Sequence, residues 1–130
     1  MNYELGAFRD MKKNIVQDKS YAFASRIVKT YKLLVNEQRE YVLSKQVLRG
    51  GTSIGANVEE ALAASSAADF VHKLNIAAKE ARETSYWLRL LHDNDFLPTA
   101  LFESIYADST ELSKILSSII LTTKANNEVV

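Results

Sequence analysis

The feature that most constrains this chain is a row of residues repeating every three or four positions between residues 66 and 92. Its members are Phe70, Leu74, Ala77, Ala81, Thr84, Leu88 and Leu91. Steps of four and three residues place side chains on one face of an α-helix, and they recur here for three heptads. A helix of this kind must bury that face against other helices, so an all-α fold is expected.

Three other segments have the same spacing, and together they predict a bundle. The four expected helices span residues 18–36, 38–63, 66–92 and 98–122. The first has an inward row of Phe23, Ile27, Thr30 and Leu34, and the fourth a row of Leu101, Ile105, Asp108, Leu112, Ile115 and Ile119. Short connections favour antiparallel neighbours, which gives an antiparallel up-down-up-down four-helix bundle.

Local residues support these boundaries. Asp18 is the expected N-cap of the first helix, Ser66 with Asp69 resembles a capping box at the third, and Pro98 suits the first turn of the fourth. Residues 1–17 have weak periodicity. The expected organisation is therefore an N-terminal appendage at 1–17, the bundle at 18–123 and a frayed tail at 124–130.

The second segment has an unusual inward row. It consists of Leu43, Val47, Gly50, Ile54, Asn57 and Ala61. Two adjacent glycines inside a helix cost about 1 kcal/mol each against alanine, so Gly50-Gly51 needs a compensation. Glycine permits another helix to approach closely, and a local bend is the competing interpretation.

Composition excludes several classes of protein. The 130 residues include no cysteine, which rules out disulfides, thiolate catalysis and cysteine-ligated zinc. Four glycines and one proline are few for a β-rich fold. A secretory signal and an apolar run near 18 residues are both missing from the sequence, so we expect a soluble, cytoplasmic protein without membrane binding.

The formal net charge is zero, but the charge is unevenly distributed. Residues 1–49 contain ten basic and five acidic residues, so this part is +5 and the remainder −5. Three interpretations are open: ordinary solvated helix faces, opposite charges meeting between subunits, or a basic face for a polyanion. The candidate nucleic-acid-binding residues are Arg26, Lys29, Lys32, Arg39 and Lys45.

A polar stripe follows the apolar row of the second helix. It contains Gln46, Arg49, Ser53, Asn57 and Glu60, and the third helix carries Glu80, Glu83 and Trp87 at matching spacing. If the two helices are antiparallel neighbours, Arg49 meets a carboxylate, with Ser53 and Asn57 as hydrogen-bond partners. The stripe is interpreted as a structural or interface network, with a ligand or nucleic-acid site as the alternative.

Catalytic and metal sites are weakly supported. Glu59, Glu60, Glu80 and Glu83 offer an acid–base pair, but no nucleophile or phosphate loop accompanies them. Asp69 and His72 share a helix face, yet a di-iron bundle needs two Glu-x-x-His pairs, and the sequence has none. We therefore expect no catalytic residues, no metal and no cofactor. Six aromatic residues are expected to be core or interface anchors, with stacking on bases as the alternative. They are Tyr21, Phe23, Tyr31, Tyr41, Tyr86 and Trp87.

Residues 46–60 read Gln-Val-Leu-Arg-Gly-Gly-Thr-Ser-Ile-Gly-Ala-Asn-Val-Glu-Glu, and they match the pattern Q-x-x-R-x-x-x-S-x-x-x-N-x-x-E at every fixed place. Residues 69–70 and 76–88, with Tyr21, Phe23, Tyr41 and Leu43, fit as well. Over about residues 18–122 the chain resembles the bacterial four helix bundle protein family. Its members include proteins encoded by intervening sequences in large-subunit ribosomal RNA genes, and the retroelement accessory variability determinant protein is related.

The resemblance implies architecture more than activity. It implies a left-handed bundle that assembles into a ring-like homopentamer, with no biochemical role assigned to most members. The retroelement relative binds nucleic acid and a reverse transcriptase and is highly basic, whereas this chain has no net charge. The expected function is a non-enzymatic homo-oligomeric scaffold or interaction protein whose protein partner is unknown. The alternative is an accessory protein that binds RNA or DNA through the basic first half.

Overall fold

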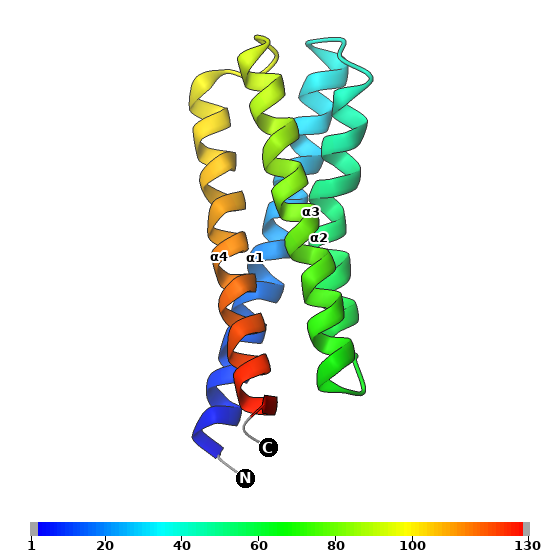
Figure 1. Cartoon of the computed structure of the whole chain (residues 1–130). Coiled ribbons are helices and arrows are strands. Elements are labelled where there is room, and N and C mark those ends of the chain that lie inside the picture. Colours follow the sequence, from blue (N-terminus) through cyan, green and yellow to red (C-terminus); the bar gives the residue numbers. More distant parts are fainter. Residues whose placement is uncertain (1–2, 129–130) are drawn as a thin grey trace.

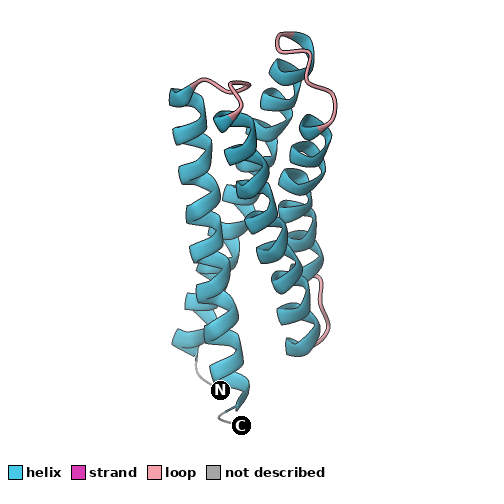
Figure 2. Cartoon of the chain, turned by 45° about the horizontal axis from the view of Figure 1, so that its top comes forward, coloured by secondary structure: helices cyan, strands magenta, loops and turns pink. Residues whose placement is uncertain are grey.

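The computed structural model describes residues 3–128 and places them in four helices, with no strand in that range. The helices are α1 (Tyr3–Asn36), α2 (Leu43–Leu62), α3 (Ala67–Asp93) and α4 (Thr99–Glu128). Consecutive helices run in opposite directions (Figure 1), and loops lie only at the ends of the bundle (Figure 2). Each helix packs on the next, and α4 closes the bundle against α1. The expected four-helix bundle is confirmed.

The rows that were expected to face inward on α1 and α3 are confirmed, because every member is buried. On α4 the expected row is wrong at Leu101, Asp108 and Ile115, which are only half-buried. The residues that α4 buries are Ile105, Ser109, Leu112, Leu116, Ile119, Ile120 and Thr123. A strict seven-residue repeat drifts around a helix of 3.6 residues per turn, so an expected row leaves the buried face over several turns.

The outer helices are longer than the sequence indicated. The start expected at residue 18 is wrong, because α1 already begins at Tyr3 and Asp18 is an exposed residue inside it. Val16 and Ser20 are buried and extend the inward row by further turns, which keeps the chain helical. Likewise α4 continues to Glu128 and buries Thr123. Neither helix is interrupted at residue 17 or 123; residues 1–2 and 129–130 of the expected appendage and tail lie outside the described residues.

The ends of α3 and α4 follow their local sequence. Ser66 is the N-cap of α3, and its hydroxyl accepts a hydrogen bond from the Asp69 N–H at 3.1 Å. Pro98 directly precedes α4, and its carbonyl accepts from the Phe102 N–H at 3.0 Å. Both residues therefore lie at helix starts, where serine and proline are favoured.

The start of α2 depends on a carboxylate that the sequence did not single out. Glu40 is buried, and its two oxygens accept hydrogen bonds from the N–H groups of Val42, Leu43 and Ser44 at 3.0, 2.8 and 2.6 Å. Burial by itself raises the pKa of Glu40, but these backbone hydrogen bonds outweigh burial and hold the pKa below its ordinary value. The carboxylate thus satisfies the first N–H groups of α2, which begins at Leu43 rather than at the expected residue 38.

The glycine pair lets α2 approach both of its neighbours. A methyl group on Gly51 would lie 2.6 Å from Cγ1 of Ile27 on α1, and one on Gly50 would lie 2.7 Å from Oγ1 of Thr84 on α3. Both distances are shorter than van der Waals contact, so neither position has room for a side chain in this packing. Helix α2 is continuous through the pair. The expectation of close approach is confirmed, and the competing interpretation of a local bend stays a prediction.

Candidate functional site between α2 and α3

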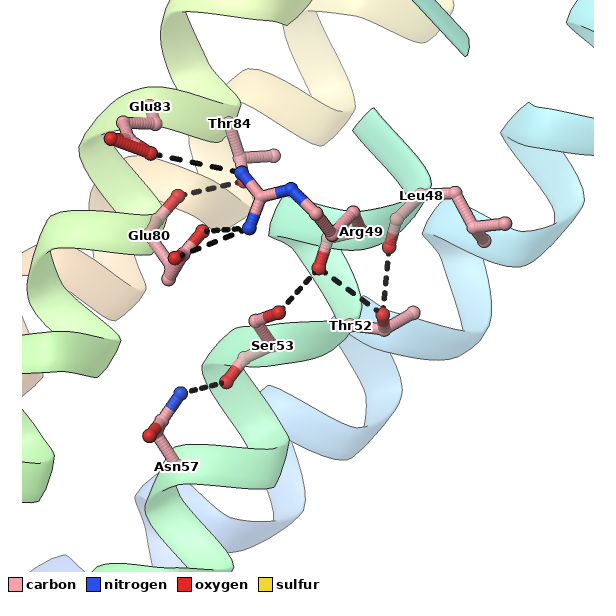
Figure 3. A network of polar contacts seen from close by, with 8 residues as sticks. All are labelled: Leu48, Arg49, Thr52, Ser53, Asn57, Glu80, Glu83 and Thr84. Carbon is pink, nitrogen blue, oxygen red and sulfur yellow. Dashed lines mark hydrogen bonds and ion pairs between the residues drawn. The ribbon is translucent and has the colours of Figure 1, made fainter. Parts of the chain in front are cut away.

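The polar stripe of α2 faces the carboxylates of α3, as the spacing predicted (Figure 3). Arg49 Nη1 lies 3.4 Å from both Oε1 and Oε2 of Glu80, and Arg49 Nη2 lies 3.9 Å from Oε2 of Glu83. One guanidinium therefore holds two carboxylates that are one helical turn apart.

The two partners of the Arg49–Glu80 ion pair differ in their exposure to solvent. The Glu80 side chain is 11% exposed, whereas that of Arg49 is 54% exposed. Strong guanidinium–carboxylate hydrogen bonds measure about 2.7–2.9 Å, so contacts of 3.4 Å are loose. Solvent screens the arginine, and the pair is closer to a surface ion pair than to a buried one.

Two members of the stripe do not reach across to α3. Ser53 Oγ donates to the Arg49 carbonyl at 2.5 Å, and Asn57 Nδ2 donates to the Ser53 carbonyl at 2.9 Å (Figure 3). The expectation that they partner Arg49 and the carboxylates is wrong, because their short side chains bond to the preceding turn of their own helix.

Gln46 and Glu60 are exposed at the two ends of the stripe. Neither side chain has a hydrogen bond or ion pair within the described part of the chain. On α3, Trp87 packs edge-on against Tyr86 with ring centroids 5.1 Å apart, and its buried Nε1 has no hydrogen-bond partner among the described residues. The network that the structure brings together is therefore Arg49 with Glu80 and Glu83.

The carboxylates that were weighed as an acid–base pair are dispersed. Glu59 accepts from Gln17 Nε2 at 3.1 and 3.2 Å, on the side of α2 that faces α1. Glu80 is occupied by Arg49. Among the side chains that the structure describes, those of residues 15–127, no three histidine, aspartate or glutamate residues are grouped in a way that could hold a metal ion.

The candidate nucleic-acid-binding residues divide into two sets. Arg26 Nη1 lies 2.8 Å from Asp108 Oδ2 and 3.0 Å from Ser104 Oγ, so this residue joins α1 to α4. Lys19 makes a second such contact, 2.9 Å from Glu111. The remaining candidates, Lys29, Lys32, Arg39 and Lys45, are exposed. Part of the basic first half therefore meets acidic residues within one chain.

The aromatic residues also divide. Phe23 is buried in the core, as expected, and Tyr31 and Trp87 are half-buried. Tyr21, Tyr41 and Tyr86 are exposed, with Tyr21 at 76%. These three are therefore not core residues, and their expected role as interface anchors stays a prediction.

Fold and site together define an all-α four-helix bundle with an ion-pair network between α2 and α3. Residues 12–118 match the family model described as 23S rRNA-intervening sequence protein, and the chain belongs to this family. No curated protein matches the chain. Within residues 3–128, none of the helices is both long and apolar enough to cross a membrane.

A solved relative has the same architecture. It is a crystal structure of a protein with unknown function from the S23 ribosomal protein family of Bacteroides thetaiotaomicron VPI-5482. The two sequences are 60% identical, the match covers 84% of this chain and 97% of the other, and the TM-score is 0.83. The family and the bundle are thus shown, and the similarity supplies no activity.

Proposed function

We propose that this protein is a non-enzymatic, homo-oligomeric scaffold. The observation that carries the proposal is the exposure of large apolar side chains on α1, Tyr21 and Val28, and at the end of the loop that leads into α2, Tyr41 and Val42. Large apolar side chains that the fold leaves exposed favour a contact with another protein surface. The Arg49–Glu80–Glu83 network then serves the fold rather than a reaction.

The assembly size follows from the resemblance to ring-forming family members, which favours five copies. Light scattering on a sizing column tests both statements. A molar mass near five times 14.6 kDa supports the ring. A mass of 14.6 kDa at every concentration contradicts the scaffold proposal itself.

Nucleic-acid binding is the second candidate, and one specific observation favours it. Lys29 and Lys32 on α1 and Lys45 on α2 are exposed, and the loop between these helices carries Arg39 and the exposed ring of Tyr41. Lysines contact phosphates, and aromatic rings stack on bases. The family is also named for an intervening sequence of 23S rRNA. Arg26 is not part of this candidate surface, because Asp108 occupies it.

Fluorescence anisotropy with a labelled single-stranded RNA tests this candidate. We expect the affinity to fall steeply as salt rises, and to fall again in the triple variant Lys29→Glu, Lys32→Glu, Lys45→Glu. Lys79→Glu, at an exposed position on α3, is the matched control for charge. Binding that the triple variant does not weaken contradicts the candidate.

A further inference from the structure

From His72 to Asp93, helix α3 exposes a single row of side chains to solvent. The members of this row repeat at steps of three and four residues, and every other residue in the range is buried or half-buried. They are His72, Asn75, Lys79, Arg82, Tyr86, Arg89 and Asp93. Helices α2 and α4 pack on the flanks of α3, so this row is its outward face.

The charges of α3 are divided between its flank and its outward face. The carboxylates of Glu80 and Glu83 lie toward α2, 3.4 and 3.9 Å from the guanidinium of Arg49. Three cations lie instead in the outward row, and none of them has an ion pair among the side chains that the structure describes. They are Lys79, Arg82 and Arg89. The outward face is therefore positive here, although residues 50–130 together carry a net charge of −5.

The positive stretch has a defined length. Asp93 ends the row at the α3–α4 loop, and the exposed Glu103 of α4 lies near the same end. The three cations precede this end, and ten residues separate Lys79 from Arg89, which is about 15 Å along the helix axis. A facing helix of about three turns is long enough to contact the whole stretch.

Tyr86 lies within the positive stretch and is 47% exposed. Trp87 packs against its ring with centroids 5.1 Å apart, and the guanidinium carbon of Arg89 lies 5.9 Å from the ring centroid. These two contacts hold the ring in place on the helix surface. Tyrosine and arginine are the residue types that dominate the binding energy of many protein interfaces.

We propose that α3 binds an acidic helix of another protein through the stretch from Lys79 to Arg89. The spacing of the row is that by which one helix contacts another, so it matches carboxylates that recur every three or four residues on a facing helix. A guanidinium binds a carboxylate through two parallel hydrogen bonds, and Tyr86 adds apolar contact between the charges.

The surroundings of Tyr86 favour a protein partner over a nucleic acid. A base stacks on an open aromatic face, whereas Arg89 lies over the Tyr86 ring and Trp87 packs against it, which reduces the area left for stacking. The inference goes beyond the proposed scaffold, because this row contains none of the apolar residues that carry that proposal. It holds for any number of copies.

A synthetic peptide tests the row in the full-length protein. The probe is a labelled, alanine-rich peptide of about 20 residues, long enough to form a helix in water, with glutamates spaced three and four residues apart on one face. The control peptide has glutamine at the same positions. We expect fluorescence anisotropy at about 0.15 M salt to show that the glutamate peptide binds at least about tenfold more tightly than the control.

The double variant Arg82→Glu, Arg89→Glu should weaken binding of the glutamate peptide by about tenfold or more. Both side chains are exposed, so the variant is expected to fold, and thermal unfolding checks this. Arg82→Gln, Arg89→Gln removes the same charges without adding repulsion and serves if the first variant does not fold. The matched control is Lys29→Glu, Lys45→Glu, which makes the same change in net charge on α1 and α2 and should leave the binding unchanged.

Four results overturn the inference. The first is a glutamate peptide that binds no better than its control, and the second is binding that the matched control weakens as much as the arginine variants do. The third is a single-stranded RNA that binds more tightly than the peptide and is lost in the arginine variants, which assigns the row to nucleic acid. The fourth is a changed molar mass of the arginine variants, which assigns the row to a contact between copies. The first three leave the scaffold proposal standing, since that proposal fails only if the wild type is a monomer.

Discussion

The two sides of this bundle are held together by different means. On the α2 side, Gly50 and Gly51 bring the backbone of α2 against Thr84 and Ile27, so that shape determines the fit. On the α4 side, the links between α1 and α4 include two surface ion pairs, Lys19–Glu111 and Arg26–Asp108, with separations of 2.9 and 2.8 Å. Close-packed interfaces tolerate little change in volume, whereas solvated ion pairs contribute little to stability.

This difference predicts where the molecule is sensitive. An added methyl group on α2 meets atoms that cannot move away easily, while a truncated charge on α4 is replaced by water. Substitutions on the two sides should therefore differ in how much they lower the free energy of unfolding, even when they change similar numbers of atoms.

The largest effect is expected for Gly51→Ala. The new methyl group meets Cγ1 and Cγ2 of the buried Ile27 at 2.6 and 2.8 Å, and overpacking of this kind costs about 1–3 kcal/mol. Alanine returns about 1 kcal/mol of helix propensity, which leaves a net loss of up to about 2 kcal/mol in the free energy of unfolding. Chemical denaturation measures it. Gly55→Ala is the control: its methyl group has room at 3.4 Å, so a loss as large as that of Gly51→Ala contradicts the argument.

The next effect is expected for Glu40→Gln at the start of α2. The variant loses the charge that accepts three backbone N–H groups, and we expect a loss of about 0.5–2 kcal/mol at pH 7. The folded pKa of Glu40 is lowered, so its stabilisation is fully present above the ordinary value of 4.5 and is lost as pH falls through the folded pKa. Denaturation at pH 7, 5, 4 and 3 should show the difference between wild type and variant shrinking below about pH 4.5. A difference that is constant over this range disagrees with the lowered pKa.

A smaller effect is expected for Arg49→Ala. Removing the cation leaves the nearly buried Glu80 carboxylate without its partner, but Arg49 is half-exposed and its contacts are long. We discount for solvent screening and expect a loss of about 1 kcal/mol. Asn57→Ala should cost less, because Asn57 bonds only to a carbonyl of its own helix. Thermal unfolding of both variants compares them, and a larger loss in Asn57→Ala contradicts this assignment.

The smallest effect is expected for Arg26→Ala on the α1–α4 side. Both members of the Arg26–Asp108 pair are more than one third exposed, so we expect a loss within about 0.5 kcal/mol that decreases further at about 1 M salt. Lys29→Ala, at an exposed position one turn away, is the control. If Arg26→Ala destabilises the protein more than Gly51→Ala, the contrast between the two sides of the bundle is wrong.

Periodicity was sufficient to predict the helices but not their ends. The inward rows of α1 and α3 are buried as expected, because four-three spacing is a direct consequence of helix geometry. The predicted start of α1 was too late in the chain, and that of α2 was too early. Asp18 resembles an N-cap, but the buried row of α1 continues before it. For α2, the capping residue Glu40 lies outside the helix, next to Arg39, whose positive φ of 53° turns the chain between the two helices.

The candidate site was predicted in outline. The facing of Arg49 and the two α3 carboxylates follows from spacing, and the structure confirms it. The self-contained bonding of Ser53 and Asn57 depends on side-chain rotamers, which sequence spacing does not specify. The pairing of Arg26 with Asp108 could not be predicted from spacing either, because the two residues are far apart in the chain and meet only when α4 packs against α1.

An even number of antiparallel helices has a practical consequence for the chain ends. The first turn of α1 and the last turn of α4 lie at the same end of the molecule (Figure 1). A reporter domain genetically fused to either terminus would therefore leave from that end. In a homo-oligomer, the distance between two fluorophores attached there would therefore report on how the copies are oriented relative to each other.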